Sequence, residues 1–399
     1  MPAVAHPSRF GDLDEVRRRY DPATVDMITR SVFESDTAAD RLVERFAELP
    51  GGAGWRMLDV ALRDGIDAVT EPPAELAAFV QDAITPPDWV DLELVDRGAV
   101  AWWRAGGPLQ LLALTAGSLA YGYSTSFARP LLITGRLKER AGRRLGETAN
   151  WVLLATRPGQ LHPGAEGLRE TVRIRLVHAL IRRHLRRSGE WDTANWGEPI
   201  SVGDTLATGI IGFCAYPITG LQRLGVEYSA EELEAMVHLW SWISHLQGVP
   251  HEYLPKTWDE AVALWHTAQE VEEVRIEGAD QLVHALLFHG LGIDAVFPRP
   301  LGGPLSRAAG YGMAAVARDW MGDERADILH VPHSRLAAGI PVLRALIRLR
   351  ERLRRAGLAP SDERLVRFEL FAANHVMALM RSKPPMTPGA TAEKPALAT

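Results

Sequence analysis

The sequence has 399 residues, of which 47% are hydrophobic, and this is enough apolar material for the core of one large domain or of two. The formal net charge is −6 and both signs are interspersed, so no sustained cationic face indicates a nucleic-acid partner. The single cysteine, Cys214, excludes an intramolecular disulfide and a zinc–cysteine cluster.

The start of the sequence has neither an apolar signal core nor a twin-arginine leader, so we expect a cytoplasmic protein.

Helical patterns follow one another along the chain. Helical periodicity recurs at 37–49, 74–84, 230–246 and 342–357, whereas alternating strand patterns are scarce. Turn signals rich in proline and glycine interrupt it at 50–52, 85–89, 157–167 and 297–304. The sequence therefore predicts an all-α fold, with a single multi-helix domain over 1–382 and a disordered tail over 383–399.

Two long stretches, 105–128 and 205–222, carry no charge. The first approaches the length that a bilayer span requires, but it is rich in glycine, serine, threonine and tyrosine. The second is interrupted by Pro217. We therefore expect two buried helices and no stable membrane span.

The segment RIRLVHALIRRHL, at 173–185, places His178 within an apolar, arginine-rich helix. A rotation of about 100° per residue puts Arg175 and Arg182 on the same side of the helix as His178. Because an unpaired buried charge is costly, both arginines need anionic partners, either carboxylates from another helix or a bound anionic cofactor. Haem fits the second option, because it takes an axial imidazole, an apolar wall and cations for its two propionates.

A second candidate helix, ERAGRRLGETANWVLLAT, precedes the histidine helix. The same rotation places Arg144, Glu147, Thr148 and Trp151 on one face. Such a face indicates either the lining of a pocket or an exposed surface on which Arg144 and Thr148 form a hydrogen bond.

These segments resemble a known family. The runs TGRLKERAGRRLGETANWVLL, RIRLVHALIRRHL and WSWISHLQGVPHEYLP are similar to the rubber oxygenases, or latex clearing proteins, and to the wider MpaB-type oxygenases, most strongly over 85–290. The resemblance implies an all-helical fold with a globin-like core and a b-type haem. It also implies that His178 is the axial iron ligand, within an R-x-x-H-x-x-x-R motif formed with Arg175 and Arg182.

The sequence departs from this family at two positions. The family's distal R-x-x-K-T pattern is matched at Arg144 and Thr148, but Glu147 replaces the lysine, and the family's catalytic acid falls on Ala128. Cleavage of rubber is therefore in question. The resemblance still implies a haem b oxygenase or oxidase for an apolar organic substrate, with dioxygen bound opposite His178.

Two alternatives remain open. One is a non-catalytic haem sensor or carrier, in which Glu147 or another side chain closes the sixth iron position. The other is a helical protein without a cofactor, in which the arginines pair with carboxylates. The substrate, the reductant and the oligomeric state are not indicated by the sequence.

Other histidines form weaker constellations. Asp327, His330 and His333 include two metal-ligand types, but Pro332 predicts a turn there. His238 and His245 lie two helical turns apart and are expected to pack in the core rather than line a pocket. Glycine-rich phosphate loops and G-x-S-x-G elbows are not found in the sequence.

Overall fold

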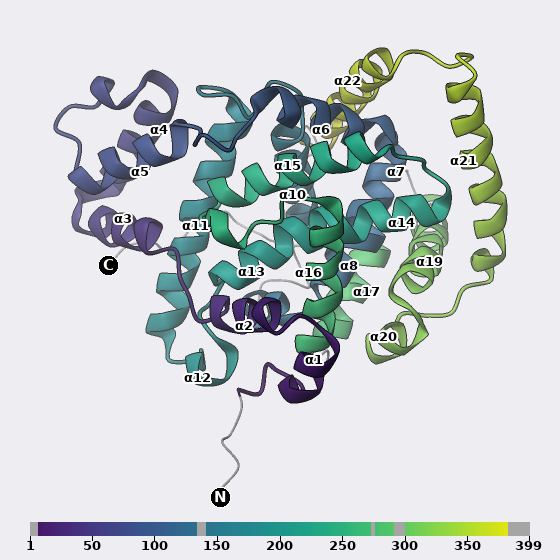
Figure 1. The fold of residues 1–399 in the computed structure, drawn as a ribbon, viewed down its shortest axis with the longest axis horizontal. Helices are drawn as coiled ribbons and strands as arrows, with labels where there is room; N and C mark the ends of the chain where they lie inside the picture. Colours follow the sequence, from purple (N-terminus) through teal and green to yellow (C-terminus); the bar gives the residue numbers. More distant parts are fainter. Residues whose placement is uncertain (1–6, 134–140, 273–275, 291–299, 382–399) are drawn as a thin grey trace, which may run out of the picture.

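The computed structural model describes residues 7–133, 141–272, 276–290 and 300–381, with side chains for all of these except 141–145 and 373–381 (Figure 1). Within these ranges the regular structure is helical, apart from one isolated bridge between Phe10 and Glu272. This confirms the predicted all-α fold. The predicted tail at 383–399 lies outside the described residues.

The helices follow one another in a compact assembly around α15, which lies near the middle of the view in Figure 1. In chain order they are α1 (Leu13–Arg19), α2 (Pro22–Ser31), α3 (Thr37–Glu48), α4 (Ala53–Asp64), α5 (Ala74–Ile84), α6 (Leu92–Arg104), α7 (Gly107–Leu112), α8 (Ala120–Gly122), α9 (Arg129–Ile133), α10 (Ala141–Ala155), α11 (Glu166–Ser188), α12 (Thr193–Trp196), α13 (Val202–Leu206), α14 (Tyr216–Leu224), α15 (Ala230–Leu246), α16 (Trp258–Val271), α17 (Ala279–His289), α19 (Gly302–Met321), α20 (Asp323–Ile328), α21 (Ile340–Arg355) and α22 (Asp362–Arg381).

Helix boundaries follow from local capping chemistry. The Asp36 side chain accepts a hydrogen bond from the backbone N–H of Ala39 and so caps α3. Ser229 and Glu232 form a capping box at the start of α15. The histidine helix α11 ends at Gly189, which has a φ of 74°, in the left-handed region that glycine adopts without strain.

The centre of the core is formed where α6 packs on α15. Gly98 of α6 permits this contact, because a Cβ atom at Gly98 would lie 2.2 Å from the backbone oxygen of Ala235. Trp102 of α6 and Trp240 of α15 are both buried and meet edge to face, with ring centroids 5.3 Å apart. These two tryptophans therefore belong to the core.

The two uncharged stretches are largely buried, as predicted, but each contains a π-helical segment. These segments are η3 (Ala113–Leu119) and η5 (Ala207–Ala215). At Gly209 a Cβ atom would lie 2.1 Å from Ser244 Oγ, so η5 fits closely against α15. Within the described ranges, no helix has both the length and the apolar character needed to cross a bilayer.

Candidate active site

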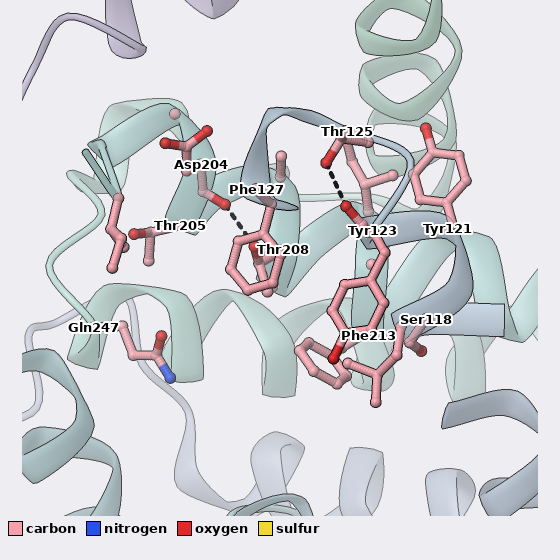
Figure 2. A pocket seen from close by; sticks show the side chains of 18 of the residues that line it. Ser118, Tyr121, Tyr123, Thr125, Phe127, Asp204, Thr205, Thr208, Phe213 and Gln247 are labelled. Atoms are coloured by element: carbon pink, nitrogen blue, oxygen red, sulfur yellow. Dashed lines mark hydrogen bonds between the residues drawn. The ribbon is translucent and has the colours of Figure 1, made fainter. Parts of the chain in front are cut away.

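A cavity of about 410 Å³ lies beside η5, within the volume range of small-molecule sites. Its wall is largely apolar, and the polar groups on it are mainly hydroxyls (Figure 2). Two of these hydroxyls are satisfied by the backbone, because Thr208 Oγ1 donates to the Asp204 carbonyl over 2.7 Å and Thr125 Oγ1 to the Gly122 carbonyl over 2.8 Å. The cavity therefore favours an apolar ligand.

The end of α13 and the π segment η5 together have a wide contact with the cavity. In an α-helix, residues on one face recur at intervals of three or four. Here, nearly every position from 205 to 213 lines the cavity. The π segment and the end of α13 contribute Thr205, Ala207, Thr208, Gly209, Ile211, Gly212 and Phe213.

His178 borders this cavity from α11, beside Ile174, Val177 and Ile181. Its Nδ1 atom is buried, and no described residue forms a hydrogen bond with it. Burial, followed by the positive charge of Arg182, lowers the pKa of His178 to about 4. The imidazole is therefore neutral near pH 7, which is the form that binds a metal.

Arg175 and Arg182 face away from this cavity, toward α3. Arg175 Nε lies 2.6 Å from Asp36 Oδ2, and Arg182 Nε lies 2.7 Å from Asp40 Oδ1. The side chains of Arg175, His178 and Arg182 nevertheless border one small cavity, as expected for residues on the same side of α11. We predicted that these arginines bind propionates because they need anionic partners. In the structure, Asp36 and Asp40 at the start of α3 are such partners.

A second, small cavity is shared by His178 and the two arginines. It has a volume of about 10 Å³ and is lined by Arg175, His178, Arg182 and Gln247, among others. Both Arg182 Nη2 and His178 Nδ1 are buried without a hydrogen-bond partner among the described residues. This volume approaches the minimum that a cavity needs to hold one water molecule, and these two groups supply polar partners for it.

The α10 helix contributes the other wall that the sequence indicated. Glu147, Thr148 and Trp151 all line the large cavity, so the pocket-lining interpretation holds for these three residues. Trp151 Nε1 donates to Thr171 Oγ1 over 3.1 Å, which ties α10 to α11. The side chain of Arg144 lies outside the described residues.

One charged corner of the cavity was not indicated by the sequence. Arg9, only 2% exposed, forms ion pairs with Asp204 and Glu272, and both carboxylates line the cavity. Arg325 also lines it, donating to Ser124 Oγ over 3.0 Å. Arg9 pairs with residues 195 and 263 positions away, so neither motif nor periodicity could indicate this cluster.

The remaining histidine candidates lie outside the cavity. His238 Nε2 accepts from the backbone N–H of Asp91 over 2.9 Å, and His245 Nδ1 lies 3.1 Å from the Val249 carbonyl. Asp327 pairs with Arg318 over 2.6 Å. Among the described residues, no group of three histidine, cysteine, aspartate or glutamate side chains is arranged to hold a metal ion.

Comparisons with known proteins identify the family. The model described as "ER-bound oxygenase mpaB/B'/Rubber oxygenase, catalytic domain" matches residues 103–368. The chain is 27% identical over 289 residues to the rubber oxygenase of Streptomyces sp. (strain K30), which covers 69% of this chain and 65% of that protein, just under two thirds of the relative's length.

The fold is similar to the structure titled "Latex Clearing Protein LCP in the closed state". The TM-score is 0.58 at 21% sequence identity, and the match covers 86% of this chain and 91% of the other. The resemblance noted in the sequence is therefore confirmed by both sequence and fold. Since the family model covers well over half of the sequence, this chain belongs to the mpaB and rubber oxygenase family, of which it carries the catalytic domain.

Proposed function

We propose that this chain is a haem b-dependent oxygenase or oxidase that acts on an apolar organic molecule. The observation that carries the proposal is His178, a neutral imidazole that borders a largely apolar cavity and has a buried Nδ1 atom without a hydrogen-bond partner among the described residues. Buried polar groups in proteins are nearly always satisfied, so Nδ1 requires a partner such as a water in the small cavity, and the other ring nitrogen is then the one that would bind a metal. Membership of an oxygenase family supports the same activity.

The residues fit haem in two respects. His178 would hold the iron, and the apolar residues of α11 and η5 would cover the ring. When bound, haem supplies the iron that activates dioxygen. A metal-bound histidine usually directs its second ring nitrogen to a fixed partner, which sets its orientation. A water in the small cavity beside Arg182 would be such a partner.

Arg175 and Arg182 act as positioning residues in this proposal. Their ion pairs with Asp36 and Asp40 fix α11 against α3 and thereby fix the direction of His178. Breaking a buried ion pair is costly because one charge is left without a partner. The histidine helix is therefore held by charges that lie beside the cavity rather than in it.

Thr148 and Arg144 would supply hydrogen-bond donors to dioxygen bound in the cavity. Donors placed in advance stabilise the negative charge that develops on oxygen as it is reduced. Thr148 lines the cavity, and Arg144 lies one helical turn before it in the sequence. Glu147, which also lines the cavity, would determine the local charge beside Thr148.

The presence of Glu147 on the cavity wall also favours a second candidate, a haem sensor or carrier whose sixth iron position is closed. An absorption spectrum of the purified protein separates the two. A Soret band with high-spin iron that forms an oxy complex supports the oxygenase. Six-coordinate low-spin iron supports the sensor or carrier, and a protein purified without a Soret band that binds no added haem contradicts both.

A further inference from the structure

The outer face of α21 carries a stripe of exposed apolar side chains. Isolated exposed leucines are common on protein surfaces, but a continuous row indicates a surface that is covered in use. The row extends along the whole helix and into the turn at its C-terminal end. Its members, with their exposed fractions, are Val342 (61%), Leu346 (60%), Leu349 (51%), Leu353 (42%) and Leu358 (75%).

The geometry of the helix makes these side chains contiguous. Val342, Leu346, Leu349 and Leu353 are spaced by four, three and four residues, so they share one side. The backbone N–H of Leu358 donates to the Leu353 carbonyl over 2.9 Å, after Gly357 with a φ of 70°. This turn brings Leu358 back toward the end of the stripe.

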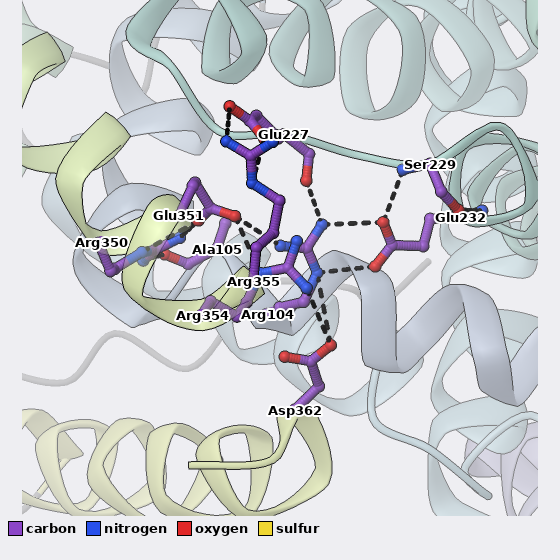
Figure 3. Close-up of polar contacts among 10 residues, drawn as sticks. All are labelled: Arg104, Ala105, Glu227, Ser229, Glu232, Arg350, Glu351, Arg354, Arg355 and Asp362. Atoms are coloured by element: carbon purple, nitrogen blue, oxygen red, sulfur yellow. Dashed lines mark hydrogen bonds and ion pairs between the residues drawn. The ribbon is translucent and has the colours of Figure 1, made fainter. Parts of the chain in front are cut away.

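The opposite face of α21 is anchored firmly. Glu351 is fully buried and lies 3.2 Å from Arg104 of α6, 2.6 Å from Arg350 and 3.0 Å from Arg354 (Figure 3). Ile347 is buried on the same side. The stripe therefore points outward from a fixed helix, which lies at the outer edge of the assembly in Figure 1.

The charges beside the stripe are positive. Arg348 and Arg352 are exposed, and the ion pairs of α21 within the described part of the chain involve its other arginines. The acidic residue of α21, Glu351, is buried beneath the helix. The exposed face of α21 thus combines leucines with arginines and presents no carboxylate.

We infer that α21 is an interfacial helix that lays this stripe on the surface of a bilayer containing anionic lipids. A helix with one apolar face and a cationic flank inserts its apolar side chains at the level of the headgroups, where acidic lipids attract the arginines. A bilayer deforms around a convex ridge such as α21, whereas a protein partner needs a matching groove. This inference does not depend on the bound cofactor.

A second copy of the chain is a poorer fit to the same face. Self-association through the stripe would bring the arginines of both copies together without an exposed carboxylate from either helix. Like charges placed opposite each other oppose association. A symmetric contact between two α21 helices therefore supplies no counter-charge, whereas an anionic lipid surface does.

The test is co-sedimentation of the whole purified protein with vesicles of POPC and POPG at 3:1, compared with vesicles of POPC alone. We expect binding to the mixed vesicles and at least tenfold weaker binding to POPC. The double variant Leu346→Ser/Leu349→Ser should bind the mixed vesicles at least tenfold more weakly than the parent. Arg348→Glu/Arg352→Glu should lose binding to a similar extent, since each basic residue near an anionic surface contributes about a fivefold factor.

The matched control is Leu301→Ser/Leu305→Ser, which removes two exposed leucines from the start of α19, at 59% and 42% exposure. It should bind as the parent does, and circular dichroism should show that every variant is folded. Equal binding by the parent and the stripe variant overturns the inference, as does a parent that fails to bind the mixed vesicles. A parent dimer that Leu346→Ser/Leu349→Ser dissociates in sedimentation velocity would instead assign the stripe to a contact between copies.

Discussion

Two arginine-rich helices, α11 and α21, have similar sequences but different surroundings. The first contains RLVHALIRRHLRR and the second RALIRLRERLRR, so both alternate leucine or isoleucine with arginine. In α11 the arginines pair with carboxylates of neighbouring segments, among them Asp36, Asp40 and Glu44 of the α3 region. In α21 most arginines are also paired, but the exposed Arg348 and Arg352 form no ion pair among the described residues; the paired ones are Arg344, Arg350, Arg354 and Arg355.

The difference comes from the segments that pack against each helix. The α3 segment brings acidic side chains to α11, so its arginines are neutralised and the remaining apolar face can line a cavity. The rest of the protein packs against the Glu351 side of α21, so the leucines on the opposite side remain exposed. Similar amphipathic sequences thus serve an internal site in one place and an external surface in the other.

The largest expected effect comes from replacing His178 of α11, a residue type that α21 lacks. His178→Ala should give a folded protein that is purified without haem, because the proposed iron ligand is removed. Circular dichroism and Soret absorbance, measured on the same sample, check this. A folded variant with the parent's haem content would show that His178 is not the ligand.

The second prediction compares the arginines of the two helices directly. Arg175→Leu should lower the free energy of unfolding by about 3–5 kcal/mol, since Asp36 is left buried without its partner. The matched change on α21, Arg348→Leu, should alter it by less than about 0.5 kcal/mol. Urea denaturation of both variants measures the contrast.

Haem retention in the Arg175→Leu and Asp36→Asn variants tests the role of this ion pair further. If Arg175 only positions α11, Arg175→Leu and Asp36→Asn should weaken haem retention to the same extent. A loss of haem in Arg175→Leu that is absent from Asp36→Asn would show instead that Arg175 contacts a propionate. Transfer of haem to apomyoglobin gives the rates for both.

A smaller effect concerns pH. The pKa of His178 falls from its ordinary 6.5 to about 4 in the folded chain, so the unfolded chain binds more protons between these values. The stability due to the neutral imidazole is complete above about pH 6.5 and is lost as the pH falls toward 4. Between pH 7 and pH 4.5 the free energy of unfolding of the haem-free protein should fall by about 2–3 kcal/mol more than that of the His178→Gln variant. If the free energy of unfolding of the two proteins changed equally with pH, this prediction would be wrong.

The smallest expected effect is at Glu147. Glu147→Gln removes a charge from the cavity wall and should change oxygen affinity by a factor of about five, equivalent to about 1 kcal/mol, without changing the spin state. Oxygen titration and the resting spectrum measure the two properties. A low-spin parent that becomes high-spin in Glu147→Gln would support the sensor or carrier.

Much of the fold and part of the site could be predicted from the sequence. Periodicity and turn signals indicate the helices, and rotation about the axis put Glu147, Thr148 and Trp151 on one face, which the structure shows to line the cavity. The same rotation could not tell whether the partners of Arg175 and Arg182 were aspartates or propionates, because Asp36 and Asp40 lie more than 130 positions away. Partners so distant are brought together by tertiary packing alone.

The π segments η3 and η5 constrain how the length of this chain can vary. A π turn contains more residues than an α turn, and each residue removed from a helix rotates its C-terminal part by about 100° relative to its N-terminal part. A one-residue deletion within η5 would therefore turn α14 away from its present neighbours or turn Thr205 and Thr208 away from the cavity. Insertions and deletions in these two segments should be tolerated far less readily than substitutions of the same residues.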